Sequence, residues 1–421
     1  MIKLYLLLIT TSIIANEVEL SVSGAQQALM PIAIIVLDAK NKELEIVAHT
    51  IKKDLLFTNQ FTPTIKKTTK KNILKEIQKL SKAGIPIALC INASSQENIE
   101  WRLYDTMQAT MLMGKEYKKR GTVERGWAHA IADEAVKNLT GNEGYFSSRI
   151  AYCKDSQNDK GATLRKIYIA DFDCSNEELL VDLPTICVAP RWHNKMASIF
   201  YSEYADTNAP LVSISMEKKR TIVSSFDGIN MLASFSPETS ATVYCSSRGN
   251  GSCQLYCYKN NNLKRFTNNS GNNVSPVFLD EDRICFCSDF QNGNPQIYIG
   301  NMATGHLQRI TKGGYCTSPA YCAKTNTIAY HKMIHGTMQI MIYDCAKKIH
   351  TQLTTSAGNK HEASWSPCGT QLLFAHETNN GKSRLANINI LTKKNTYLTR
   401  PQEQCSYPHW SACYATFPVV I

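Results

Sequence analysis

The stretch APRWHNKMASIFYSEY, residues 189–204, recurs in altered form along the second half of the chain. Each copy contains an aromatic residue at the end of a short strand-like run, and we call these six residues the repeat aromatics: Trp192, Phe235, Phe278, Tyr321, Trp365 and Trp410. They are separated by 43, 43, 43, 44 and 45 residues. A constant period of this length indicates a structural repeat.

The rest of each unit keeps the same period. A second strand-like run ends about nine residues after each of the first five repeat aromatics, as in IFY (199–201), and a third and a fourth run follow. Four short strands in 40 to 45 residues are typical of a β-propeller blade. Residues 149–184 lack a first strand and residues 406–414 supply one, so we predict that the two pieces share a sixth, composite blade that closes the ring.

Residues 16–146 have a different pattern, in which strands alternate with helices. Strands are expected over 16–22, 32–38, 85–91 and around Ile99–Leu103. Helices are expected around Leu44–Leu55, Ile73–Leu80 and Ala128–Leu139, the last ended by Gly141. The predicted fold class is therefore α+β and multidomain. A small N-terminal α/β domain over 16–146 is followed by an all-β, six-bladed propeller over 147–421.

The first fifteen residues, MIKLYLLLITTSIIA, place an apolar run after a single lysine. This pattern predicts a signal peptide (1–15) that is cleaved near Ala15, before Asn16. The alternative is a buried first strand or helix of the mature fold. After this segment, no run of 18 apolar residues predicts a membrane span.

The charge of the chain bears on its class of partner, and its cysteine content bears on metal sites and disulfides. The net charge of +11 favours acidic surroundings, but the lysines are scattered and not interleaved with aromatics, so no nucleic acid is predicted as a partner. Fifteen cysteines are an odd number, and none of their spacings suits zinc. They are either small apolar core residues or, in part, disulfides; the pairing stays open.

Sequence motifs for catalysis are absent. GNGSC (249–253) lacks the spacing of a nucleophile elbow, and HEASW (361–365) is not the zinc motif H-E-x-x-H. The Asp pairs at 171 and 173 and at 280 and 282 suit hairpin turns, with cation binding as the alternative. We therefore predict no catalytic residue, no metal site and no cofactor, and expect that the protein is not an enzyme.

The remaining candidates lie on a surface. The loops that lead into the first strands should gather at one mouth of the propeller channel, where polar and aromatic side chains can hold a partner. The predicted partner-binding residues there are Asn230, Asn273, Ser275, His361, Glu362, Tyr407 and His409. The alternative is that these are ordinary hydrated turns.

Several motifs resemble the TolB family of the Tol-Pal system, and the resemblance covers nearly the whole mature chain. They are AHAIADEAVKNLTGNEGYFSSRIAYC (128–153), LRKIYIADFD (164–173), and the blade signatures SWSPCG (364–369) and FSP (235–237). Cys368 and Glu238 stand where the family signature has Asp.

The resemblance implies a periplasmic, monomeric and non-catalytic protein that associates with membranes only indirectly. It would bind the peptidoglycan-associated lipoprotein Pal through the propeller and a TolA-like inner-membrane protein through its N-terminal segment, including Asn16, Glu17, Val18, Glu19 and Leu20. Its role would be outer-membrane integrity and invagination during cell division. Two other classes remain open, a remnant of a propeller-containing hydrolase or peptidase and a solute-binding propeller.

Overall fold

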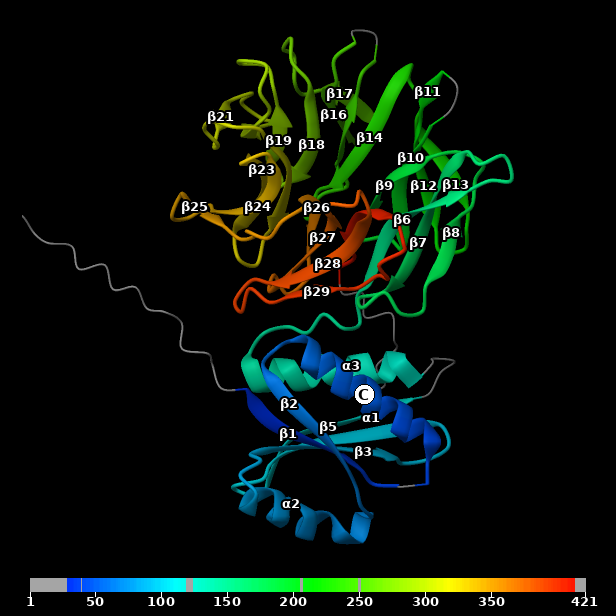
Figure 1. The fold of residues 1–421 in the computed structure, drawn as a ribbon, viewed down its shortest axis with the longest axis vertical. Coiled ribbons are helices and arrows are strands. Elements are labelled where there is room, and N and C mark those ends of the chain that lie inside the picture. The colour runs from blue at the N-terminus through cyan, green and yellow to red at the C-terminus, as the bar shows by residue number, and fades with distance from the viewer. Residues whose placement is uncertain (1–28, 39, 119–123, 205–206, 249–250, 413–421) are drawn as a thin grey trace, which may run out of the picture.

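The computed structural model describes residues 29–38, 40–118, 124–204, 207–248 and 251–412. Figure 1 shows an N-terminal domain of one sheet and three α-helices beside a ring of β-sheets. The predicted strand over 16–22 lies outside the described residues.

The N-terminal sheet has five strands in the order β2-β1-β3-β4-β5. Their bounds are β1 (Met30–Val36), β2 (Phe61–Lys67), β3 (Ile87–Ala93), β4 (Asn98–Asp105) and β5 (Thr110–Lys118). β1 pairs in parallel with both β2 and β3, and β3, β4 and β5 are antiparallel. The sequence did not lead us to expect β2 or β5, because Pro63 and two lysines interrupt β2 and β5 is largely exposed.

Helices cover both faces of this sheet. α1 (Lys42–Phe57) and α3 (Glu124–Thr140) pack on one face, and α2 (Ile73–Lys82), preceded by the 3-10 turn η1 (Lys70–Asn72), packs on the other. Coverage on both sides explains why β1 and β3 are continuously apolar instead of alternating. The side chain of Asn41 caps α1 by accepting from the backbone N–H of Leu44 at 3.2 Å. Gly141, with φ of 74°, ends α3 as expected.

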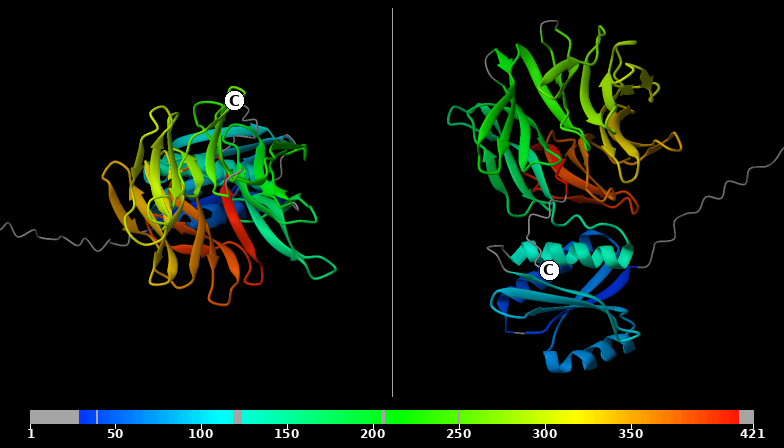
Figure 2. Two further views of the ribbon diagram at one scale, coloured as in Figure 1. Left: turned by 90° about the horizontal axis from the view of Figure 1, so that it is seen from above. Right: turned by 180° about the vertical axis from the view of Figure 1, so that it is seen from behind.

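The propeller consists of six blades around one axis (Figures 1 and 2). Blade 1 contains β9 (Cys187–Trp192), β10 (Ser198–Glu203), β12 (Leu211–Ser215) and β13 (Arg220–Ser224). Blade 2 contains β14 (Gly228–Phe235), β15 (Thr242–Ser246), β16 (Gln254–Lys259) and β17 (Asn262–Arg265), with the short β11 (Asn208–Ala209) beside β14. Blade 3 contains β18 (Asn273–Phe278), β19 (Arg283–Ser288), β20 (Gln296–Asn301) and β21 (Leu307–Arg309).

The last three blades include the joint between the two ends of the ring. Blade 4 contains β22 (Cys316–Cys322), β23 (Thr327–Ile334), β24 (Thr337–Asp344) and β25 (Ile349–Gln352). Blade 5 contains β26 (Asn359–Trp365), β27 (Gln371–Glu377), β28 (Ser383–Asn389) and β29 (Asn395–Tyr397). Blade 6 joins β30 (Cys405–Trp410) to β6 (Arg149–Gln157), β7 (Thr163–Asp171) and β8 (Glu178–Val181). The predicted fold class and the composite blade are thus confirmed.

The cysteines of the described segments are all free thiols. Two of them act as donors between blades: Cys153 Sγ donates to the carbonyl of Cys187 at 3.4 Å, and Cys287 Sγ donates to that of Cys316 at 3.5 Å. Ser202 Oγ makes the corresponding bond between blades 1 and 2, at 2.8 Å. Between blades 6 and 1 and between blades 3 and 4, a buried thiol thus donates the bond that a hydroxyl donates between blades 1 and 2.

The N-terminal domain packs against blades 5 and 6 through α1 and α3. Tyr145, in the connection after α3, lies edge-on to Trp410 with ring centroids 5.8 Å apart. Asn389 Nδ2, at the end of β28, donates to the carbonyl of Thr58 at 3.1 Å. One hydrophobic core therefore runs continuously from the sheet into the propeller.

An ionic cluster lies at the same interface. Arg125 on α3 donates through Nε to Asp171 and through Nη2 to Asp173, both at 3.1 Å. His129, one turn later, lies 2.8 Å from Asp54 on α1, measured from Nδ1 to Oδ2. The two aspartates that the sequence suggested as turn formers at the end of β7 thus also bind α3.

Candidate functional site

The channel is lined by the first strand of each blade, namely β9, β14, β18, β22, β26 and β30. Each first strand has one non-glycine residue with positive φ, three positions before its repeat aromatic. These residues are Ala189, Leu232, Ser275, Ser318, Glu362 and Tyr407, with φ between 51° and 58°. The pairing register with the second strand shifts at the same place in every blade. Such a bulge re-aims the side chains that follow it. We call the residues before it the leading half of the strand and those after it the trailing half.

Two predicted site residues support the turn before the strand. Asn230 and Asn273 are fully buried, five positions before their repeat aromatics. Asn230 Nδ2 donates to the carbonyl of Phe226 at 2.7 Å, and Asn273 Nδ2 donates to that of Gly271 at 3.1 Å. A partner could reach these amides only if the turns opened.

Lys360 stands at the same position in blade 5 and is also fully buried. Its Nζ donates to the carbonyls of Ala357 at 3.0 Å and Gly358 at 2.7 Å, and also to that of Ser356. A lysine thus replaces the asparagine amide and donates to three carbonyls, the same number as Asn230 Nδ2 does. Sequence reasoning missed it, although its spacing from Trp365 equals that of Asn230 from Phe235.

Neighbouring blades are joined just before the repeat aromatics. At three joints the preceding side chain accepts a hydrogen bond from the backbone N–H of the next repeat aromatic: Ser234 Oγ at 3.1 Å, Ser364 Oγ at 2.9 Å and His409 Nδ1 at 3.2 Å. Burial, together with the charge of Arg191, lowers the pKa of His409 well below its usual value. The imidazole is therefore a neutral acceptor that joins blade 6 to blade 1.

The structure brings Glu362 and Tyr407 together. The carboxylate of Glu362 accepts a hydrogen bond from the backbone N–H of Tyr407, across the joint between blades 5 and 6. Burial raises the pKa of Glu362 to about 7. His361 lies apart from them, with its side chain 39% exposed and its Nε2 3.4 Å from Glu377 Oε2.

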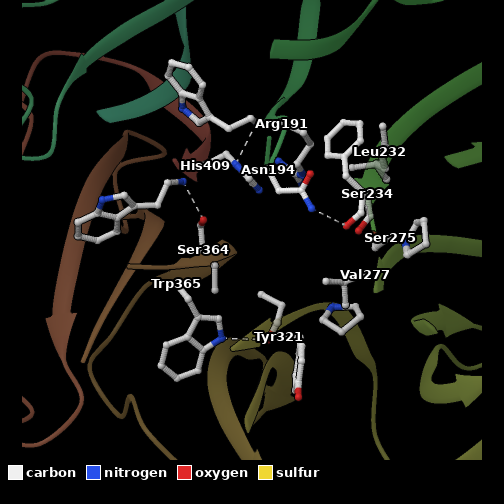
Figure 3. Close-up of a pocket in the computed structure, with 18 residues that line it drawn as sticks. Arg191, Asn194, Leu232, Ser234, Ser275, Val277, Tyr321, Ser364, Trp365 and His409 are labelled. Atoms are coloured by element: carbon white, nitrogen blue, oxygen red, sulfur yellow. Dashed lines mark hydrogen bonds between the residues drawn. The ribbon is translucent and has the colours of Figure 1, made fainter. Parts of the chain in front are cut away.

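The trailing halves enclose a cavity of about 240 Å³ (Figure 3). Of the predicted residues, Ser275 and His409 line it. Asn16, Glu17, Val18, Glu19 and Leu20 lie outside the described residues. The cavity also contains Arg191, which sequence reasoning missed because the residue before each repeat aromatic differs from blade to blade.

Two features are absent from the described segments, a metal-binding cluster and a membrane-spanning helix. These segments contain no group of three or more His, Cys, Asp or Glu side chains arranged to hold a metal ion. No helix in those segments is long and apolar enough to cross a membrane.

Comparison with known proteins gives three concordant results. A family model described as "TolB beta propeller domain" matches residues 136–414. The chain is 30% identical over 234 residues to Tol-Pal system protein TolB of Legionella pneumophila and 28% identical over 223 residues to that of Rickettsia canadensis. These alignments cover 54% and 49% of this chain and 55% and 50% of the relatives, so the chain spans about half the length of the curated relatives it matches.

A solved structure covers more of the chain. The crystal structure of TolB from Acinetobacter baumannii superposes with a TM-score of 0.78, covering 93% of this chain and 98% of that one, at 22% sequence identity. The likeness at this identity concerns the fold, and it extends over the N-terminal domain as well as the propeller.

Proposed function

The chain belongs to the TolB β-propeller family, and on this basis we propose that it is a non-catalytic, periplasmic component of the Tol-Pal system. The observation that carries the proposal is the family match over residues 136–414, which spans the end of α3 and all six blades. A rigid propeller that presents a polar rim, joined to a second domain, is suited to holding two other proteins at once.

We propose that the propeller binds the peptidoglycan-associated lipoprotein Pal at the mouth formed by the leading halves. His361 and Glu377 support this choice, because their side chains are 39% and 40% exposed on adjacent strands, β26 and β27, and can meet a partner without rearrangement. The two buried asparagines would act indirectly, by fixing the shape of the turns beside the mouth.

The N-terminal segment is proposed to bind a TolA-like inner-membrane protein. A short segment of alternating polar and apolar residues can add as a strand to an open sheet edge. β2 and β5 are the edge strands of the N-terminal sheet. In this proposal the segment is a switch, released for its partner or held by the protein, and it couples the partner to Pal binding.

Isothermal titration calorimetry of the chain from Asn16 to Ile421 with Pal of the same organism tests this function. Saturable binding is expected, and a changed affinity in a chain that starts at Ala28 would show that the N-terminal segment is coupled to the Pal site. His361→Ala should weaken binding by about tenfold if it is at the centre of the contact.

His306→Ala is the matched control, because His306 is exposed on the turn after β20 and outside the proposed mouth. It should bind as the unaltered chain does. A folded protein that shows no binding, with or without residues 16–27, would contradict the proposed function.

A further inference from the structure

Lysines that are scattered along the sequence gather on the outermost helix of the N-terminal domain. α2 lies at the end of the molecule opposite the propeller, with its axis running across the long axis of the molecule (Figures 1 and 2). Ile77 and Leu80 are buried on the inner side of this helix. Lys75, Lys79 and Lys82 follow one another at helical spacing on the outer side, and all three are exposed. A flat surface that meets this end of the molecule would contact α2 along its length.

Neighbouring segments add to the positive charge. In β2, Phe61 and Ile65 pack into the core that contains α1, so the alternation of a strand places Lys66 on the other face of the sheet, with α2. Lys70 and Lys71, in η1, are exposed at the start of the helix. We call six lysines the basic face: Lys66, Lys70, Lys71, Lys75, Lys79 and Lys82.

Few acids oppose the basic face. Lys79 has Glu76 at 3.3 Å, and within the described residues no other member has a carboxylate oxygen within 4.0 Å. The acids on the same side of the sheet, Glu100 and Glu116, belong to β4 and β5 and bind side chains of those two strands. The basic face therefore has a net positive charge that solvent ions or an anionic surface must balance.

Two exposed apolar side chains lie beside the basic face. Leu74, in the first turn of α2, and Met107, in the turn between β4 and β5, are each 63% exposed. Ser81 Oγ donates to Met107 Sδ at 3.6 Å, so the methionine lies beside the last turn of the helix. Exposed lysines next to exposed apolar groups suit an anionic lipid surface, because headgroups balance the charge and the membrane interface accepts the apolar groups.

From these observations we propose that the basic face binds a membrane surface that contains anionic lipid headgroups. Lysines suit such a surface because each is a point charge on a flexible stem and can follow headgroups that move. The contact needs no protein partner, so it differs from the indirect membrane association that the family resemblance implies. It is also independent of the proposed function, since the propeller lies at the other end of the molecule.

Cosedimentation of the chain from Asn16 to Ile421 with lipid vesicles tests the proposal in the absence of any other protein. Vesicles of phosphatidylcholine with about one third phosphatidylglycerol should bind at least about tenfold more strongly than pure phosphatidylcholine, since each lysine near an anionic surface changes the binding constant about fivefold. Binding should be lost at about 1 M salt, where charges act over only about 3 Å. Equal sedimentation with both kinds of vesicle would overturn the proposal.

A triple variant locates the contact. Lys71→Gln, Lys75→Gln and Lys82→Gln in one chain should weaken binding to the anionic vesicles by at least about tenfold. The matched control makes the same change at three exposed lysines on turns of the propeller: Lys160, Lys312 and Lys382. The control should bind as the unaltered chain does. A triple variant that binds as tightly as the control, or an equal loss in both, contradicts the assignment to α2.

Leu74→Trp gives a local readout and keeps the test open if the triple variant does not fold. Brominated lipid in the anionic vesicles should quench the emission of the added tryptophan, whereas none of the five tryptophans of the chain is exposed to it. Sedimentation without this quenching would place the contact on another surface and overturn the proposal. Binding of heparin without binding of the vesicles would indicate an acidic polymer as the partner and would also overturn it.

Discussion

Lys360 has no acidic partner within ion-pair distance in the described part of the chain, yet its side chain is fully buried. Its ammonium group is held by the carbonyls of the turn at 356–358. Asn230 and Asn273 perform the same task in blades 2 and 3 with an amide. In blades 2, 3 and 5 the turn thus requires a donor at this position, and the residue type that supplies it varies; blades 1, 4 and 6 have cysteine there.

Replacing Lys360 tests that requirement. Lys360→Leu should lower the free energy of unfolding by about 1 to 3 kcal/mol, because the turn keeps buried carbonyls that lose a donor. Lys360→Asn should recover most of the loss. Equilibrium unfolding in urea measures both, and a leucine variant as stable as the unaltered chain would show that the carbonyls need no donor.

Gly144 is required by close packing at the end of α3. A Cβ at this position would lie 2.4 Å from Asp133 Cα, where no side-chain movement can relieve the contact. Gly144→Ala should therefore destabilise the protein by several times more than Gly141→Ala. Gly141 has open space around it, so alanine there should cost only the roughly 1 kcal/mol of a left-handed backbone. The midpoints of thermal unfolding of the two variants give the comparison.

At the scale of elements, α3 is fixed to α1 and β7 by a buried histidine. Burial alone would lower the pKa of His129, but the hydrogen bonds and charges of Asp171 and Asp54 outweigh it and raise the pKa to about 9. Arg125 and Asp173 are the other charged groups at this contact, and the ring of Phe172 packs edge-on against the imidazole.

This raised pKa gives a pH dependence with a definite sign. The folded state binds the proton more tightly than the unfolded state, so the stabilisation is complete below about pH 6.5 and is lost as the pH rises towards 9. His129→Gln should cost about 2 to 3 kcal/mol at pH 6 and progressively less at higher pH. Urea unfolding of both proteins between pH 6 and 9 gives the difference, and a difference that does not change with pH would contradict the assignment.

At the scale of the whole molecule, the ring depends on one strand that comes from the far end of the chain. β30 pairs with β6, and Ser411 accepts from the backbone N–H of Arg149 through Oγ and donates to its carbonyl through its own N–H, both at 2.8 Å. Without β30, blade 6 lacks its first strand and β6 becomes an open edge next to the core shared with the N-terminal domain.

Truncation tests the closure. A chain that ends at Gln404 should lose cooperative unfolding and the near-ultraviolet circular dichroism of packed aromatics. A chain that ends at Ala412 keeps β30 and serves as the control; it should unfold as the full chain does. A cooperative transition at the original midpoint in the shorter chain would mean that the ring does not need this strand.

Much of the fold could be predicted because it follows from local patterns of apolar and turn residues in the sequence. The spacing of the repeat aromatics determined the number of blades, and the incomplete runs at 149–184 and 406–414 determined the composite one. β2 and β5 were not predicted, because both are edge strands and lack a regular alternation of apolar and polar residues. An edge strand can contain a proline, as β2 does at Pro63, or expose most of its side chains, as β5 does.

The candidate site was less predictable, because its residues are defined by partners distant in sequence. The joint between Trp192 and His409 connects residues 217 positions apart, and Asn389 meets Thr58 across 331 positions. Periodicity indicates which residues lie on a strand. It does not indicate whether a polar side chain there bonds to its own turn, as Asn273 does, or lines a cavity, as Arg191 does.

The sequence by itself therefore determined the repeat and the closure of the ring, since these follow from which residues can form strands. Only the tertiary structure decided the cavity and the contacts of the helices with the propeller, since these depend on burial and charge across elements that the chain brings together when it folds.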